Sequence, residues 1–240
     1  MSSEMYVALS GQMAMAERLS TVANNVANMR TAGFRAETVD FDTVLSDYRQ
    51  DRVAFASPGR MHIDRAVGPV EATGNPLDLA VAGEGWFGVD TPAGRAYTRD
   101  GRFTINPFGD LVTLTGYNVV DEGGAPIAVN PQGGEIVVGI DGRIEQDGRV
   151  LGVVGLFEIP PDAVLTRHGD VALLSNVPAE PIADRTVNGV RQGFREGSNV
   201  DAVKSIVELI EIQRAFDRTT TVMRERSASL EEAVRLLGNG

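Results

Sequence analysis

The chain has 240 residues, of which 42% are hydrophobic and 23% are charged, and its formal net charge is −11. This length and composition are those of a globular protein with one large or two smaller domains, and they exclude a disordered chain. The acidic balance, with no basic cluster, argues against a nucleic-acid-binding protein. Because the chain contains no cysteine, disulfides and cysteine-ligated metals are excluded.

The sequence also lacks the usual signals of membrane insertion and of secretion with a cleaved leader. No run of about 18 apolar residues predicts a transmembrane helix. The opening residues, MSSEMYVALSGQ, contain neither a basic stretch nor the sustained apolar stretch of a signal peptide. We therefore expect a cytoplasmic protein or one that is exported without a cleaved signal.

Composition divides the chain into three zones. All 11 prolines lie between Pro58 and Pro181, and 22 of the 27 glycines lie between residues 37 and 196. The excess of acidic over basic side chains also lies within residues 37–196, whereas the two ends are close to neutral. This pattern predicts two helical ends that flank an acidic, turn-rich centre.

The N-terminal zone is predicted to be a helix. Apolar residues recur at spacings of three and four from Met5 to Val26, as on one face of an amphipathic helix. We expect Gly33 to end this helix as its C′ residue, with Phe34 anchoring the turn that follows.

The C-terminal zone is predicted to be a longer helix, with Ser198 or Asn199 as its N-cap. From Leu209 to Leu237 the apolar residues follow the alternating spacing of a heptad repeat, broken by Arg226. The helix would run for roughly 35 residues, or about 50 Å. A helix of this length favours packing against a partner helix, and the alternative is a helix that lies over its own domain.

The centre is predicted to be β-structure. In residues 77–159, short apolar runs alternate with Asp-Gly, Asn-Pro and Gly-Asp turns, at intervals of about ten residues. The pairs Asp141-Gly142 and Asp147-Gly148 are strong hairpin signals. Because no helical periodicity interrupts this segment, βαβ units are excluded and an antiparallel sandwich or barrel is favoured. For residues 37–75 the sequence does not decide between strands and an adaptable loop.

Several apparent chemical motifs do not predict a catalytic, cofactor or metal site. The stretch from Gly83 to Gly88 matches G-x-G-x-x-G, but a dinucleotide site needs a helix to start there, and Pro92 and turn signals follow instead. His62 and His168 stand alone, without a ligand pattern. The Asp-Gly pairs lack the spacing of a calcium loop. We therefore expect a protein that is not an enzyme and binds no cofactor.

Four stretches together resemble the bacterial flagellar axial proteins, the rod and hook family. They are LSTVANNVANMRTAGFRAE, GNPLDLAVAGEGWFGV, YTRDGRFTINPFGDLVTLTGYNVV and EGSNVDAVKSIVELIEIQRAFD, and they occur in the order that the family has. The resemblance covers both ends and about half of the centre. Trp86 departs from the family pattern, where Phe or Tyr is more usual, and Asp217 replaces the usual Glu.

The resemblance implies a structural subunit of a helical tube that carries torque from motor to hook. Length and opening residues favour a proximal-rod subunit; a distal-rod subunit is the close alternative, and a hook protein comes third. It also implies assembly with copies of itself and with other rod proteins, export by the flagellar type III apparatus, and a place in the periplasmic part of the basal body. A phage tail or fibre protein is the alternative structural function, and a small-molecule enzyme is a remote third.

The expected fold class is α+β. The long terminal helices would pack as a coiled-coil-like pair, and the centre would form an antiparallel all-β domain that resembles a sandwich or a barrel. The expected boundaries are an N-terminal helical segment at 1–36, an extended linker at 37–75, the β-rich domain at 76–196 and a C-terminal helix at 197–240. The two helical segments would form the inner domain of the tube.

The expected functional residues form an assembly interface on these helices. The three amides at Asn24, Asn25 and Asn28 are poor helix formers, and they lie opposite the apolar face. Amides suit a crowded interface where charges would be costly to bury, so we expect them to contact neighbouring helices or backbone in the tube. The predicted interface is Leu9, Met13, Leu19, Val22, Asn24, Asn25, Val26, Asn28, Gly33, Phe34, Leu209, Ile212, Phe216, Met223, Leu230 and Leu237.

Overall fold

The computed structural model describes residues 2–48, 51–185 and 187–238, and the chain divides by its packing into two units. Unit 1 comprises Met1–Ala27, Glu37–His62 and Asp201–Gly240. Unit 2 comprises Asn28–Ala36 and Ile63–Val200. The chain therefore passes between the units at four points, and each unit is built from segments that are distant in sequence.

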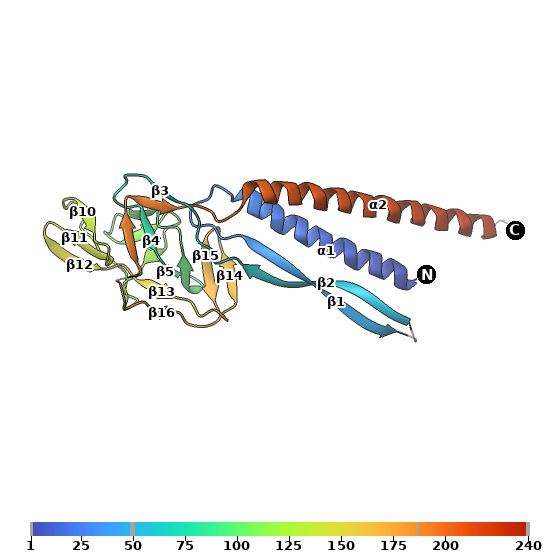
Figure 1. The fold of residues 1–240 in the computed structure, drawn as a ribbon, viewed down its shortest axis with the longest axis horizontal. Coiled ribbons are helices and arrows are strands. Elements are labelled where there is room, and N and C mark those ends of the chain that lie inside the picture. Colours follow the sequence, from blue (N-terminus) through green and yellow to red (C-terminus); the bar gives the residue numbers. More distant parts are fainter. Residues whose placement is uncertain (1, 49–50, 186, 239–240) are drawn as a thin grey trace. The chain divides into compact units, whose positions relative to one another are not determined.

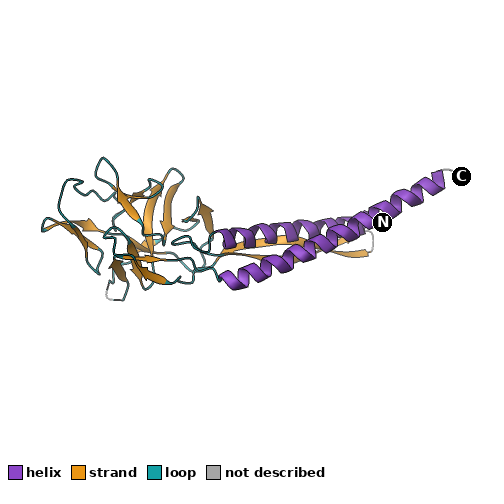
Figure 2. Cartoon of the chain, turned by 90° about the horizontal axis from the view of Figure 1, so that it is seen from above, coloured by secondary structure: helices purple, strands orange, loops and turns teal. Residues whose placement is uncertain are grey.

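Unit 1 contains two long helices and a two-stranded hairpin, drawn in Figure 1. Their bounds are α1 (Ser2–Ala27), β1 (Glu37–Tyr48), β2 (Asp51–Ile63) and α2 (Ala202–Gly238). The helices run antiparallel and side by side, and Figure 2 shows α2 extending past the N-terminal end of α1. Helix α1 contacts both α2 and β1. The segment at residues 37–63, which the sequence left open, is thus a β-hairpin.

The ends of both helices differ from the predicted ends. Helix α1 stops at Ala27, so Gly33 is not its C′ residue, although Gly33 does adopt a positive φ of 68° in a later turn. Helix α2 starts at Ala202, and Asp201 caps it by accepting a hydrogen bond of 3.0 Å from the backbone N–H of Lys204. The predicted caps Ser198 and Asn199 therefore precede the helix.

The α+β class is consistent with the structure, but the predicted coiled-coil-like pairing of the helices is wrong. A coiled coil needs a continuous seam of buried apolar knobs on both helices. Leu9 and Met13 of the predicted seam are 44% and 62% exposed, and on the described part of α2 only Ile212 is buried. The contacts between the helices include polar ones, and α1 divides its packing between α2 and β1.

Unit 2 is built mainly of antiparallel strands around a nine-stranded sheet. The path of that sheet runs β14-β15-β6-β5-β9-β8-β7, with β13 pairing β5 and β16 pairing β13. Because this path is open, the large sheet is not a closed barrel, and smaller sheets accompany it. The strands of the large sheet are β5 (Trp86–Thr91), β6 (Gly94–Thr98), β7 (Phe103–Ile105), β8 (Leu111–Thr113), β9 (Asn118–Val119), β13 (Leu156–Glu158), β14 (Leu165–His168), β15 (Ala172–Ser175) and β16 (Glu180–Pro181).

Three smaller antiparallel sheets complete unit 2. Strand β10 pairs β11, which pairs β12; β4 pairs β17; and β3 pairs β18. The turn between β11 and β12 is the predicted hairpin at Asp147-Gly148, with φ of 53° and 73° at its two residues. The strands are β3 (Val70–Ala72), β4 (Leu79–Ala82), β10 (Ile136–Val138), β11 (Arg143–Gln146), β12 (Arg149–Val153), β17 (Gly189–Gln192) and β18 (Phe194–Glu196).

The hydrophobic core of unit 2 explains why its strands form where they do. Alternate residues of β5, Phe87 and Val89, are wholly buried and pack with Leu156 of β13 in the main cluster. The opposite face of β5 directs Trp86 into a second cluster with Tyr97 and Phe157. The stretch after Gly83 is therefore a strand buried on both faces, so no helix begins at the G-x-G-x-x-G sequence. Within the described residues, neither helix combines the length and apolarity needed to cross a membrane.

Candidate functional site

The predicted interface residues on α1 divide between exposed and buried positions. Leu9 and Met13 are exposed, whereas Val22 and Asn25 are buried, with only 6% and 7% of their surface exposed. The remaining predicted positions on or just after the helix are half-buried: Leu19, Asn24, Val26 and Asn28. Among these predicted positions, the exposed apolar side chains therefore lie in the N-terminal half of α1, and buried Val22 lies in its C-terminal half.

One of the three amides has a clear role inside the chain. The Nδ2 group of Asn25 donates a hydrogen bond of 2.7 Å to the carbonyl oxygen of Glu37, and its Oδ1 accepts one of 2.9 Å from the backbone N–H of the same residue. The side chain thus pairs with the first residue of β1 as a neighbouring strand would. Asn28 Oδ1 accepts a hydrogen bond of 3.0 Å from Thr31 Oγ1 in the turn after the helix.

The predicted positions on α2 line the side of the helix that faces the rest of unit 1. Ile212 is 6% exposed, and Leu209, Phe216 and Met223 are half-buried. The side chains of Leu230 and Leu237 lie outside the described residues. Polar contacts join this side to α1: Gln12 Nε2 donates to Thr220 Oγ1 at 3.0 Å, and Arg18 pairs with Glu208 at 2.6 Å.

A second apolar face of α2 is exposed. Val203, Ile206, Val207 and Ile210 are 75%, 41%, 50% and 44% exposed. At about 100° per residue, these positions lie about 120–180° around the helix from Ile212. Four apolar side chains at helical spacing on the open side of a helix are suited to contact another helix. In the sequence this stripe is a weaker signal than the heptad pattern further along the helix.

Gly33 and Phe34 lie in the interior of unit 2 and have close contacts there. Phe34 is fully buried, and the Arg167 guanidinium lies 4.3 Å from the centre of its ring. The Gly33 N–H donates to the Glu196 carbonyl oxygen at 2.9 Å. A Cβ on residue 33 would lie 2.1 Å from the backbone nitrogen of Asp100, so only glycine fits this close approach. An assembly role for these two residues stays a prediction.

A buried ionic cluster next to Gly33 was missed by the sequence analysis. Glu196 is fully buried; its Oε1 accepts hydrogen bonds from Arg35 and, at 2.9 Å, from the Gly68 N–H. Its Oε2 accepts one of 2.9 Å from Arg99 Nη1. The guanidinium groups of Arg35 and Arg99 also lie 5.5 and 5.3 Å from the ring centre of Trp86. One carboxylate and one indole ring thus hold two buried cations.

The charge balance of this cluster is uneven, with two guanidinium groups for one carboxylate. Burial lowers the pKa of Arg35, and the charge of nearby Glu196 opposes that shift. The Nε atoms of Arg35 and Arg99 have no hydrogen-bond partner among the described residues, so the faces of Trp86 supply the remaining stabilisation of their charge.

A network around Asn199 ties together the segments through which the chain leaves unit 2. Asn199 Oδ1 accepts a hydrogen bond of 2.7 Å from the Ala36 N–H, and its Nδ2 donates to the carbonyl oxygens of Asp64 and Ala66 at 3.2 and 3.0 Å. Arg167 adds a hydrogen bond of 2.6 Å to the Arg35 carbonyl oxygen. The segments before residue 37, after residue 62 and before residue 201 are therefore joined directly.

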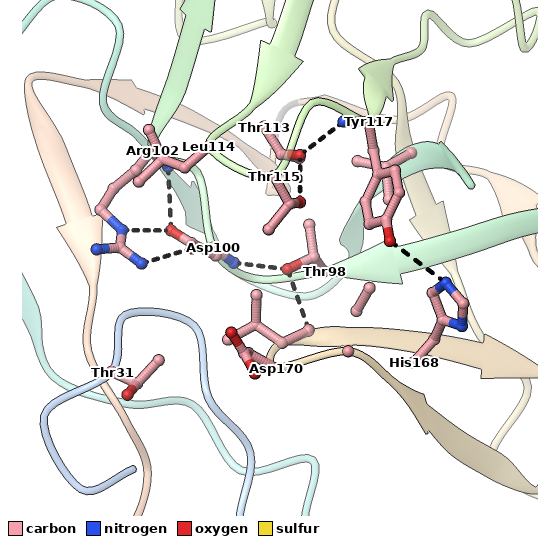
Figure 3. Close-up of a pocket in the computed structure, with 14 residues that line it drawn as sticks. Thr31, Thr98, Asp100, Arg102, Thr113, Leu114, Thr115, Tyr117, His168 and Asp170 are labelled. Carbon is pink, nitrogen blue, oxygen red and sulfur yellow. Dashed lines mark hydrogen bonds and ion pairs between the residues drawn. The ribbon is translucent and has the colours of Figure 1, made fainter. Parts of the chain in front are cut away.

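Unit 2 also contains a pocket of about 310 Å³. Figure 3 shows Asp100 and Arg102 paired on one side of it, and Tyr117 and His168 approaching each other on the other. Val89 and Ala172 contribute apolar surface. Within the described residues no three His, Asp or Glu side chains gather as metal ligands would.

Comparison with known proteins shows what family the chain belongs to. Three family models match it in order: Flagella basal body rod protein at residues 5–35, Flagellar hook protein FlgE/F/G D1 domain at 80–146, and Flagellar basal body rod FlgEFG protein C-terminal at 191–236. The flagellar basal-body rod protein FlgF of Mesorhizobium japonicum is 43% identical over 100% of this chain and 99% of that protein. The FlgF of Rhizobium meliloti is 45% identical over 99% of both chains. The chain belongs to the FlgF family of flagellar basal-body rod proteins.

Membership of the FlgF family confirms the resemblance to the flagellar rod and hook proteins. It also confirms the preference for FlgF over the other rod protein, FlgG. The flagellar basal-body rod protein FlgG of Bacillus subtilis, from the competing subtype, is 29% identical over 97% of this chain. The FlgF family is one of structural rod proteins, and this sets aside the phage-tail alternative.

The three matched segments meet in the buried cluster. Arg35 lies in the first, Arg99 in the second and Glu196 in the third. Sequence separations of 161 and 97 residues join Glu196 to the two arginines. The sequence does place all three residues within the stretches that resemble the flagellar family. A single sequence does not show, however, that residues so far apart come together in the fold.

Proposed function

We infer that this chain is a structural subunit of the bacterial flagellar basal-body rod. The observation that carries this conclusion is its similarity over the full length to FlgF proteins at 43–45% identity. The exposed apolar face of α2 supports it, because such a face is expected on a subunit that is completed by neighbours.

We propose that the subunit lies in the proximal part of the rod, where it joins copies of itself and other rod proteins in a helical tube that transmits torque. Subunits that use different patches on their two sides extend as a helix when the rotation between neighbours does not close a ring. In this proposal residues 1–36 and 197–240 belong to the inner part of the tube, residues 37–75 connect it to the remainder, and residues 76–196 lie further out.

The proposal extends to export and to the absence of catalysis. A rod subunit reaches the periplasmic part of the basal body, and we propose that this chain does so through the flagellar type III apparatus without a cleaved signal. Its function is then carried by contacts between subunits, with no catalytic step and no cofactor.

The proposed assembly surface centres on the exposed apolar side chains of both helices. Leu9 and Met13 on α1 belong to the predicted interface, and Val207 and Ile210 on α2 extend it. Burying these side chains against neighbours would stabilise the assembly by about 25 cal/mol for each Å² of apolar surface removed from water.

Deletion and complementation in the source bacterium test the proposal. Deleting the gene should abolish swimming and leave basal bodies with incomplete rods in electron micrographs, and the intact gene should restore both. Val207→Asp should restore neither, because it places a charge in the exposed apolar face, whereas Lys204→Asp on the same turn of the helix should restore both. Normal swimming of the deletion strain would refute the rod function.

A further inference from the structure

We propose that Phe108 of one copy of this chain inserts into the pocket of a second copy, as a head-to-tail contact between the β-rich units. The proposal deepens the rod function and rests on it. It assigns a role to the most exposed large apolar side chain of the described residues, since Phe108 is 90% exposed.

The backbone at Phe108 is fixed in a tight turn between β7 and β8. The Asn106 side chain fixes this turn, because its Oδ1 accepts hydrogen bonds of 2.9 Å from the N–H groups of both Phe108 and Asp110. The Gly109 N–H closes the turn on the Asn106 carbonyl oxygen at 3.0 Å. A large aromatic side chain on a fixed turn loses little conformational entropy on binding, as a contact residue should.

The pocket is large enough for a phenyl ring. Its volume is about 310 Å³, whereas an apolar cavity of about 150 Å³ in another protein accommodates benzene. Val89 and Leu114 both line the pocket; Val89 is fully buried and Leu114 is 60% exposed. The pocket therefore offers both buried and accessible apolar surface.

Polar groups around the pocket are largely engaged with each other. Arg102 donates two hydrogen bonds of 2.8 Å to the Asp100 carboxylate, and this bonding raises the pKa of Arg102. Thr113 Oγ1 lies 2.9 Å from Thr115 Oγ1, as Figure 3 shows. Because these groups satisfy one another, the pocket favours an apolar guest over a charged one.

The location of the two features predicts contact between copies. The turn that carries Phe108 precedes β8, and the residues Thr113, Leu114 and Thr115 of the pocket follow at its other end. A strand advances about 3.3 Å per residue, so the rigid strand keeps Phe108 from entering the pocket of its own chain. A protruding group and a receiving pocket at opposite ends of one strand give a heterologous contact, the kind that an extended assembly requires.

Cysteine pairs test this contact cleanly, because the chain has no cysteine of its own. Pro107→Cys combined with Thr115→Cys places one thiol beside Phe108 and one at the pocket rim. Oxidation of this full-length variant with diamide should give dimers, trimers and longer species on non-reducing gels. Adding Phe108→Ala should abolish the series. Each single cysteine variant should stop at dimers, since one thiol can form one disulfide.

Val187→Cys combined with Thr115→Cys is the matched control, because Val187 is also highly exposed, at 76%. This pair should give no extended series. The inference is overturned if the Pro107 pair gives no series, if the series survives Phe108→Ala, or if the Val187 pair gives an equal one.

Swimming assays separate this inference from the rod function itself. In the deletion strain, Phe108→Ala and Leu114→Asp should both reduce the swim-ring diameter, and Phe108→Leu should restore it. If the deletion strain does not swim but Phe108→Ala swims fully, the contact is wrong and the rod function stands. If Leu114→Asp alone is defective, another partner fills the pocket and the inference fails. A swimming deletion strain refutes the rod function.

Discussion

At the scale of single residues, Glu196 is the side chain on which most contacts converge. It bonds two arginines and a backbone N–H, and each arginine belongs to a different family segment. A carboxylate in this position neutralises charge that burial would otherwise make costly. Its loss should therefore affect all three segments together.

Glu196→Gln should destabilise unit 2 by about 3–5 kcal/mol, because it leaves two buried guanidinium groups without a countercharge. Urea unfolding followed by tryptophan fluorescence measures this effect at the cluster, since Trp86 is the only tryptophan and contacts both arginines. The midpoint should fall to much lower urea concentration, with the slope unchanged.

An exposed ion pair supplies the control for that measurement. Glu71 pairs with Arg195 at 3.1 Å, and the two side chains are 59% and 43% exposed. Glu71→Gln should change stability by about 0–1 kcal/mol, as is usual for surface pairs. Equal effects of the two substitutions would show that the buried cluster contributes no more than a surface pair.

At the scale of elements, the hairpin β1–β2 depends on a side chain of α1 for its start. Asn25→Ala removes both hydrogen bonds from this side chain to the backbone of Glu37. The cost should be about 1–3 kcal/mol, confined to unit 1. Faster hydrogen exchange in the peptide that begins at Glu37 measures it. Ser20→Ala, at an exposed position of the same helix, should leave that exchange rate unchanged.

The elements also show what the sequence could and could not predict. The two helices and the Asp147-Gly148 hairpin follow from local signals, namely apolar spacing and a turn that needs positive φ. The coiled-coil pairing failed because spacing on one helix does not reveal its partner, and α1 packs on β1 as well as α2. The hairpin at residues 37–63 had no local signal, and its start is fixed by Asn25 from another element.

The candidate site divides in the same way. The amide at Asn25 was singled out because it suits a helix interior poorly; the structure bonds it to backbone within the chain, and its expected contact in the tube stays a prediction. Glu196 and Arg99 escaped notice because their partners lie far away in sequence. The pocket was missed as well, since it is formed by turns and strands from separate parts of unit 2.

At the scale of the whole molecule, burial is unequal between the two units. Unit 2 has a closed hydrophobic core, whereas on the described part of α2 only Ile212 is buried. On α1 the buried side chains Thr21, Val22 and Asn25 gather near the C-terminal end, with Ala14 further back. Helices that bury little apolar surface are only marginally stable by themselves.

Hydrogen exchange should therefore follow a gradient in the free subunit. Amides of β5 and β6 should be strongly protected, those of Thr21–Ala27 less so, and those of Val203–Ile210 weakly. In isolated basal bodies the helical amides should gain protection, because neighbours cover the exposed apolar face, while the strands change little. Comparison of free full-length chain with assembled rods by mass spectrometry measures both states. Strong protection of Val203–Ile210 before assembly would show that α2 is stable without neighbours, and that its exposed face is not completed by them.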